Sequence, residues 1–129
     1  MAMEITFPGG VAVTAEHKGF VIPTDQPEAS GGNNNNPSPY DLFLASLGTC
    51  AGFFALRFIQ QRGLSTEGLN LTLDTVRNPE TKRLDLVRIE IRLPEGFPEK
   101  YRNAVIKSVD QCAVKRVMLD PPEFEVETV

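Results

Sequence analysis

The first 24 residues alternate short apolar runs with turn signals. The apolar runs cover residues 5–7, 11–16 and 20–22, and the turn Pro8-Gly9-Gly10 separates the first two. Glycine and proline interrupt regular structure because glycine adopts conformations closed to other residues and proline lacks a backbone donor. The pattern predicts three strands within residues 1–24.

Residues 25–37 contain almost no apolar side chain. Gly31, Gly32 and the four asparagines at 33–36 favour turns over strands and offer little surface to bury. The pattern predicts a long loop over residues 25–37. A loop of this length inside a small domain is typical of a functional or mobile segment.

The next segment predicts a long helix over residues 38–62. Ser38 can cap its N-terminus, Pro39 suits the first helical position, and Asp41 complements the positive end of the helix dipole. Gly63 can supply the left-handed residue that ends the helix. Between these ends nearly every side chain is apolar, so we expect the helix to be buried all round.

Two environments could bury such a helix. A membrane is one, because an apolar run of about 18 residues is long enough to span it. Arg57 within the run and the strand-like flanks favour the other, a central helix packed on a sheet or on a partner subunit. Gly48 and Gly52 would let another backbone approach closely. Because so small a chain has little surface to cover the helix, we expect a homodimer and no membrane.

Alternation of apolar and polar residues predicts a hairpin over residues 67–93. Its first strand has leucines at 69, 71 and 73, and its return strand has apolar residues at 87, 89, 91 and 93. Leu84 and Leu86 fall on the opposite parity, which predicts a β-bulge near Leu86.

The remaining residues predict two helices and a strand. Apolar residues at spacings of three and four indicate helices over residues 98–111 and 112–119, which Pro121-Pro122 then ends. Alternation resumes in the strand predicted over residues 123–128. The whole order predicts an α+β fold, with antiparallel sheets packed on the long central helix.

The length and the charge of the chain exclude some classes of function. A chain of 129 residues fits one domain over residues 1–129 and leaves no room for a separate cofactor-binding domain. The net charge is −4 and no basic run occurs, which argues against nucleic-acid binding. The N-terminus lacks the charged and apolar regions of a secretion signal, so we expect a cytoplasmic protein.

The two cysteines, Cys50 and Cys112, are the main candidates for chemistry. Structural disulfides are rare in the cytoplasm, and two cysteines with the single His17 are too few for a zinc site. Two interpretations of the cysteines therefore remain: two inert buried thiols or a redox pair. Burial raises the pKa of a thiol, so a reactive Cys50 needs a cation or hydrogen-bond donors from elsewhere. Cys112 follows a possible helix break at Asp110-Gln111, where backbone N–H groups could face it.

Two further residues are weaker candidates. Asp41 is most simply an acid in the first turn of the helix, with a catalytic role as the alternative. His17 lies beside Lys18 and Gly19, which suggests a surface position. Any Ser-His-Asp set would have to use this one histidine, and no glycine-rich phosphate loop follows a strand.

Two cysteine motifs resemble those of the OsmC/Ohr family. Residues 36–50 (NPSPYDLFLASLGTC) resemble its central-helix signature, in which a proline-rich entry and an acidic residue precede a helix with the first cysteine. Residues 110–115 (DQCAVK) resemble the second cysteine motif. The element order also agrees, so the resemblance spans essentially the whole chain. The loop through Gly31-Gly32 looks most like that of the YhfA-like branch.

The resemblance implies an intertwined homodimer with active sites at the subunit interface. Cys50 would attack an organic hydroperoxide or hydrogen peroxide, and Cys112 would capture the resulting sulfenic acid. A dithiol reductant would close the cycle. Asp41 approximately matches the carboxylate that precedes the helix in the family. We expect no cofactor and no metal.

Two departures from the family keep other functions open. Its peroxidases use an N-terminal arginine at the thiolate, whereas no arginine precedes Arg57 here, and Lys18 cannot reproduce a guanidinium clamp. Ala113 also stands where proline is common. The alternatives are a non-catalytic redox-sensing dimer, a dimer that binds a small apolar ligand, and purely structural thiols.

Overall fold

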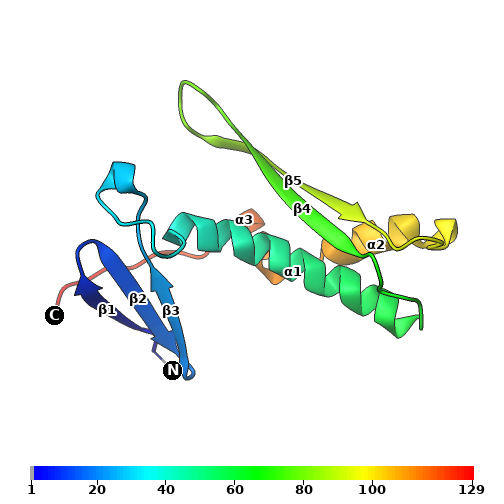
Figure 1. Ribbon diagram of the computed structural model, residues 1–129, viewed down its shortest axis with the longest axis horizontal. Helices are drawn as coiled ribbons and strands as arrows, with labels where there is room; N and C mark the ends of the chain where they lie inside the picture. Colours follow the sequence, from blue (N-terminus) through cyan, green and yellow to red (C-terminus); the bar gives the residue numbers. More distant parts are fainter. Residues whose placement is uncertain (1) are drawn as a thin grey trace. The chain divides into compact units, whose positions relative to one another are not determined.

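A computed structural model describes residues 2–129, which divide into two compact units (Figure 1). The first unit runs to Ala45 and the second from Ser46 to Val129. Both contain antiparallel strands, and helices complete the α+β fold predicted from the sequence.

The first unit contains the predicted N-terminal sheet. Its strands are β1 (Glu4–Gly9), β2 (Ala12–His17) and β3 (Phe20–Thr24), paired antiparallel in the order β1-β2-β3. The sheet leaves Phe7 and Phe20 exposed within this chain, at 78% and 70%. The side chains on an exposed sheet face are ordinarily smaller or more polar than these two phenylalanines.

The loop over residues 25–37 is organised around Asp25, a residue that the sequence pattern did not single out. This residue is only 3% exposed, and its carboxylate accepts hydrogen bonds from the backbone N–H groups of Gln26, Asn33 and Asn35. A Cβ on Gly32 would lie 1.9 Å from the Gln26 carbonyl oxygen, so only glycine fits there. The loop includes a short 3₁₀ helix, η1 (Glu28–Ser30). The asparagines therefore supply backbone donors to a buried carboxylate.

The long helix α1 (Pro39–Gln61) confirms the predicted element and both of its end signals. The Ser38 Oγ accepts the Asp41 N–H, and the Asp41 carboxylate accepts the Ser38 N–H, which makes a reciprocal cap. At the other end Gly63 has φ +65°, and the Leu64 N–H donates to the Ile59 carbonyl.

The prediction that α1 is buried all round is wrong within a single chain. Five of its 23 residues are buried, and Phe53 is 51% exposed. A Cβ on Gly48 would meet only the Leu73 side chain at 3.7 Å, and one on Gly52 would meet nothing within 4 Å. The close backbone approach expected at these glycines is therefore not made by the described residues 2–129.

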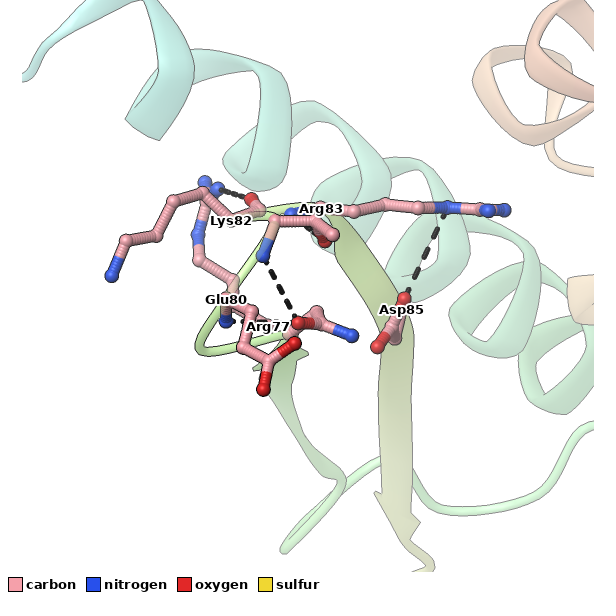
Figure 2. Close-up of polar contacts among 7 residues, drawn as sticks. Arg77, Glu80, Lys82, Arg83 and Asp85 are labelled. Atoms are coloured by element: carbon pink, nitrogen blue, oxygen red, sulfur yellow. Dashed lines mark hydrogen bonds and ion pairs between the residues drawn. The ribbon is translucent and has the colours of Figure 1, made fainter.

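The hairpin of the second unit is formed by β4 (Asn70–Arg77) and β5 (Leu84–Arg92). Val76 pairs with Leu86 and Arg77 with Leu84, so Asp85 is the extra residue of a bulge, next to the predicted position. Figure 2 shows the turn, where Arg77 donates to the Lys82 carbonyl at 2.8 Å and Arg83 lies 3.9 Å from Asp85.

Three further helices complete the second unit: η2 (Glu99–Tyr101), α2 (Arg102–Val109) and α3 (Ala113–Leu119). The sequence predicted two helices here, over residues 98–111 and 112–119. The first is instead divided into η2 and α2, and a tight turn separates α2 from α3. Ala55, Phe58 and Ile59 of α1 form the buried core with Val105 of α2.

The strand predicted over residues 123–128 is not formed. This segment has no regular structure, and Phe124 and Val126 are 87% and 94% exposed. Alternation gives a strand one apolar face, but a strand also needs the edge of a sheet to pair with. This segment pairs with no strand among the described residues 2–129.

Asp25→Asn should weaken the chain in a pH-dependent way. The backbone N–H of Gln26 in particular lowers the pKa of Asp25 below its ordinary value, with Asn35 and Asn33 adding to the effect against the opposing influence of burial. Stabilisation by a carboxylate with a lowered pKa is present above the unfolded-state value, about 3.9, and is lost as the pH falls through the folded-state pKa.

The variant should therefore have a lower urea midpoint than the natural chain at pH 7, and the gap should narrow below about pH 4. Circular dichroism during urea unfolding measures both midpoints. Asp85→Asn, at an exposed carboxylate, is the control. An equal gap at both pH values would contradict the role given to the Asp25 charge.

Candidate thiol site

The site is built from one turn of α1 and the turn that precedes α3. Cys50 lies on α1 and is half-buried, whereas Cys112 is 2% exposed. After α2 ends, backbone hydrogen bonds from Gln111 to Ser108 and from Cys112 to Val109 hold the turn closed. Both cysteines belong to the second unit, so their arrangement lies within one compact part of the chain.

Cys112 is the N-cap residue of α3. Its Sγ accepts the Lys115 N–H at 3.5 Å, so the sulfur stands where a serine or aspartate oxygen usually caps a helix. An ion pair of 2.6 Å between Lys115 Nζ and Asp110 joins the two sides of the turn. The expectation that backbone N–H groups face Cys112 at the break after residues 110–111 is confirmed.

The fold brings the thiols of Cys50 and Cys112 close enough for each to affect the acidity of the other. Burial by itself raises the pKa of Cys50. Hydrogen bonds from the Cys112 thiol and from the Val114 and Ala113 N–H groups outweigh it, so the pKa of Cys50 lies below its ordinary value. The donors are neutral groups carried by the turn and by the first residues of α3.

The same contact has the opposite effect on Cys112. Burial raises the pKa of Cys112, and donating its proton to Cys50 raises it further, against a smaller opposing effect of the Lys115 N–H. The pair is therefore polarised: the pKa of Cys50 is lowered and the pKa of Cys112 is raised. Because the thiolate is the reactive form of a cysteine, this difference makes Cys50 the more reactive thiol of the two.

The other sequence candidates have local contacts. Asp41 completes the helix cap described above, and its pairing with Ser38 accounts for its position. His17 ends β2, opposite Phe20, and its Nδ1 is buried with no hydrogen-bond partner among the described residues 2–129. The Arg57 guanidinium lies 5.8 Å from the centre of the Phe53 ring.

An apolar cavity of about 660 Å³ lies beside Cys112. Its walls come from β5, α2, α3 and the second unit's part of α1, and include Leu47, Ile89 and Val105. Two cations line it, and each is neutralised by a carboxylate that also lines it: Arg102 by Glu99 at 2.7 Å and Lys115 by Asp110. The cavity therefore suits an apolar, uncharged group.

Among residues 2–129, no group of three or more histidine, cysteine or acidic side chains is placed to hold a metal ion.

The sequence model of the OsmC-like protein family matches residues 31–127, which include both cysteine motifs. This chain therefore belongs to the OsmC-like family. A search of curated proteins finds no match. Its place within the family, which the loop at Gly31-Gly32 suggested to be the YhfA-like branch, stays a prediction.

Solved structures with the same fold include a protein from Psychrobacter arcticus described as an osmotic stress induced and detoxification response protein. It is 21% identical, with 90% of this chain and 86% of that chain covered and a TM-score of 0.76. An OsmC-like protein from Mycoplasma pneumoniae is 16% identical over 94% and 89% of the two chains, with a TM-score of 0.67.

A third similar structure is an organic hydroperoxide resistance protein OsmC from Legionella pneumophila. It is 16% identical, covers 92% of this chain and 89% of its own, and gives a TM-score of 0.56. At these identities the likeness establishes the fold, and the chemistry has to be argued from this chain's own residues.

Removing the Cys112 donor should raise the pKa of Cys50. Cys112→Ala removes the shared proton, whereas Cys112→Ser keeps a hydroxyl donor at the same position. At pH 7 the alkylation rate of Cys50 should fall about tenfold in the alanine variant, the change expected for losing a hydrogen bond of roughly 1.4 kcal/mol. In the serine variant it should stay near that of the natural chain.

The pH dependence of iodoacetamide alkylation, followed by mass spectrometry at Cys50, measures the effect. Equal profiles for the two variants would show that the Cys112 proton does not set the acidity of Cys50.

Proposed function

We propose that this protein reduces organic hydroperoxides or hydrogen peroxide through Cys50 and Cys112. The supporting observation is the polarised thiol pair in an OsmC-like chain, with the pKa of Cys50 lowered by donors from Cys112 and α3. The missing N-terminal arginine does not leave Cys50 without stabilisation, since three neutral donors act on it.

The first step is attack of the Cys50 thiolate on one peroxide oxygen. The O–O bond breaks, its electron pair leaves with the alkoxide or hydroxide, and Cys50 becomes a sulfenic acid. The Cys112 thiol, already hydrogen-bonded to Cys50, can protonate the leaving oxygen. That transfer releases an alcohol or water and makes Cys112 a thiolate.

The second step uses the thiolate that the first step creates. The Cys112 sulfur attacks the Cys50 sulfenic sulfur, hydroxide leaves, and a Cys50–Cys112 disulfide forms. A dithiol reductant would then return both thiols through a mixed disulfide. A cytoplasmic location would suit this cycle, because thiols are kept reduced there.

Cys50→Ser should abolish peroxide consumption, while Cys112→Ser should separate the two steps. With a hydroperoxide and dithiothreitol, the Cys50 variant should be at least about a hundredfold slower, since a serine hydroxyl is not ionised at neutral pH. The Cys112 variant should still form a Cys50 sulfenic acid, because its hydroxyl still donates, but should form no intramolecular disulfide.

Peroxide loss measured with a ferrous-iron dye, and trapping of sulfenic acid with dimedone, give the two readouts. Ser65→Ala, at a loop serine of similar size, is the control. Undiminished peroxide consumption by Cys50→Ser would overturn the proposed function.

A second candidate function is binding of a small apolar ligand without turnover. The observation that favours it is the cavity of about 660 Å³ beside Cys112, whose charges are neutralised in pairs. In a peroxidase the same cavity could receive the organic group of the hydroperoxide. Ligand binding that persists in Cys50→Ser, together with no peroxide loss in the natural chain, would favour this function.

We further propose that the active form is a homodimer. The helix α1 has the length and composition of a membrane-crossing helix, with 28% of its most apolar window buried. Other apolar side chains of both units are also exposed, among them Phe7, Phe20 and Leu119. A second copy that covers Phe7, Phe20, Leu119 and part of α1 explains this composition without a membrane.

The mass in solution should be about twice the 14.2 kDa of one chain. Light scattering coupled to size-exclusion chromatography at micromolar concentration measures it. The Cys50→Ser variant should have the same mass, since the proposed contacts between the two copies are apolar. A stable monomer without detergent would contradict the dimer and would leave the exposed faces of α1 unexplained.

A further inference from the structure

A second groove lies between α1 and α2, within the second unit. It encloses about 490 Å³ and is lined on its apolar side by Phe53, Phe54 and Phe58, with three cations around them, Arg57, Arg62 and Lys107. We call this the α1–α2 groove. Neither cysteine lines it, so it is distinct from the cavity beside Cys112.

Helical spacing explains how both kinds of side chain reach the groove. Along α1 and the turn that follows it, positions 53, 57 and 61 follow one another at steps of four, as do 54, 58 and 62, so two adjacent rows face the same side. On α2 the positions 104, 107 and 108 form the matching face. The first row consists of an aromatic ring, a cation and an amide, and the second places two rings before a cation.

The charge of the groove is unbalanced. No aspartate or glutamate lines it, although the whole chain has a net charge of −4. The ion pairs of the described residues 2–129 are Arg83–Asp85, Arg102–Glu99 and Lys115–Asp110, and none includes a groove cation. The larger cavity has each cation matched by a carboxylate, so the two sites differ in the charge they can accept.

The rings hold the guanidinium groups at the groove. Arg62 lies 3.5 Å above the Phe58 ring and donates to the Phe58 carbonyl at 3.2 Å. Arg57 lies 5.8 Å from the centre of the Phe53 ring. A guanidinium has five N–H donors, so one backbone bond and a stacked ring leave donors for an anion. The rings meanwhile offer apolar surface next to the charge.

We propose that the α1–α2 groove binds an amphipathic organic anion, an apolar ring or chain that carries one carboxylate. Three cations without a lining acid attract the carboxylate, and the phenylalanines contact the apolar part. Inorganic phosphate would satisfy the cations but leave the aromatic surface uncovered. The proposal is independent of peroxide chemistry, since it requires neither thiol.

Calorimetric titration of the full chain with 4-phenylbutyrate tests the groove. Binding should be saturable and should weaken with added salt. The neutral analogue 4-phenylbutanol and inorganic phosphate should each bind at least about tenfold more weakly, because each supplies only one of the two interactions.

Arg57→Gln and Lys107→Gln should each weaken 4-phenylbutyrate binding about tenfold, as expected for loss of a charge-assisted hydrogen bond. Arg102→Gln is the matched control, because this exposed arginine lines the other cavity, and it should change the affinity less than about twofold. Circular dichroism checks that each variant is folded.

Three results would overturn the proposal: equal affinity for 4-phenylbutanol, equal affinity for phosphate, or unchanged affinity in both groove variants. Amide chemical shifts locate the ligand independently. They should move at Lys107 and Ser108, and movement confined to residues 87–93 would place the ligand in the larger cavity instead and would also overturn it.

Discussion

The pairing of the Cys50 and Cys112 thiols is the interaction on which the rest of the site depends. It lowers the pKa of Cys50 and raises the pKa of Cys112, so two chemically identical groups differ in acidity. The thiols meet because the turn after α2 presents Cys112 as the N-cap of α3. The same short segment also directs the Ala113 and Val114 N–H groups at Cys50.

Neutral donors can therefore do part of what a cation does elsewhere. An arginine beside a thiolate acts through its charge over several ångströms, whereas N–H and S–H donors act only in direct contact. The acidity of Cys50 should thus be sensitive to the geometry of the turn at residues 110–112. It should be less sensitive to salt than a thiolate paired with a guanidinium.

Local signals were enough to predict much of the fold. The caps of α1, the end of that helix at Gly63, the hairpin and its bulge all follow from residues close in sequence. The two cysteine positions could be assigned by motif, but their contact could not, because 62 residues separate them and only tertiary structure joins them. Two of the three donors to Cys50, the N–H groups of Ala113 and Val114, belong to the backbone, which carries no residue-specific signal.

The wrong predictions share one physical cause. The pattern of apolar residues predicted that α1 is buried on every side and that residues 123–128 form a strand. Such a pattern shows that a surface has to be covered, but it does not show which other segment covers it. Asp25 was missed for a related reason, because two of its three donors are backbone groups eight and ten residues away.

Peptide mapping after a single equivalent of hydroperoxide tests the central claim most directly. The account predicts a Cys50–Cys112 disulfide in the natural chain, formed in step with one equivalent of alcohol. Oxidation of Cys112 ahead of Cys50, or loss of peroxide with neither cysteine altered, would contradict the assignment of the two thiols.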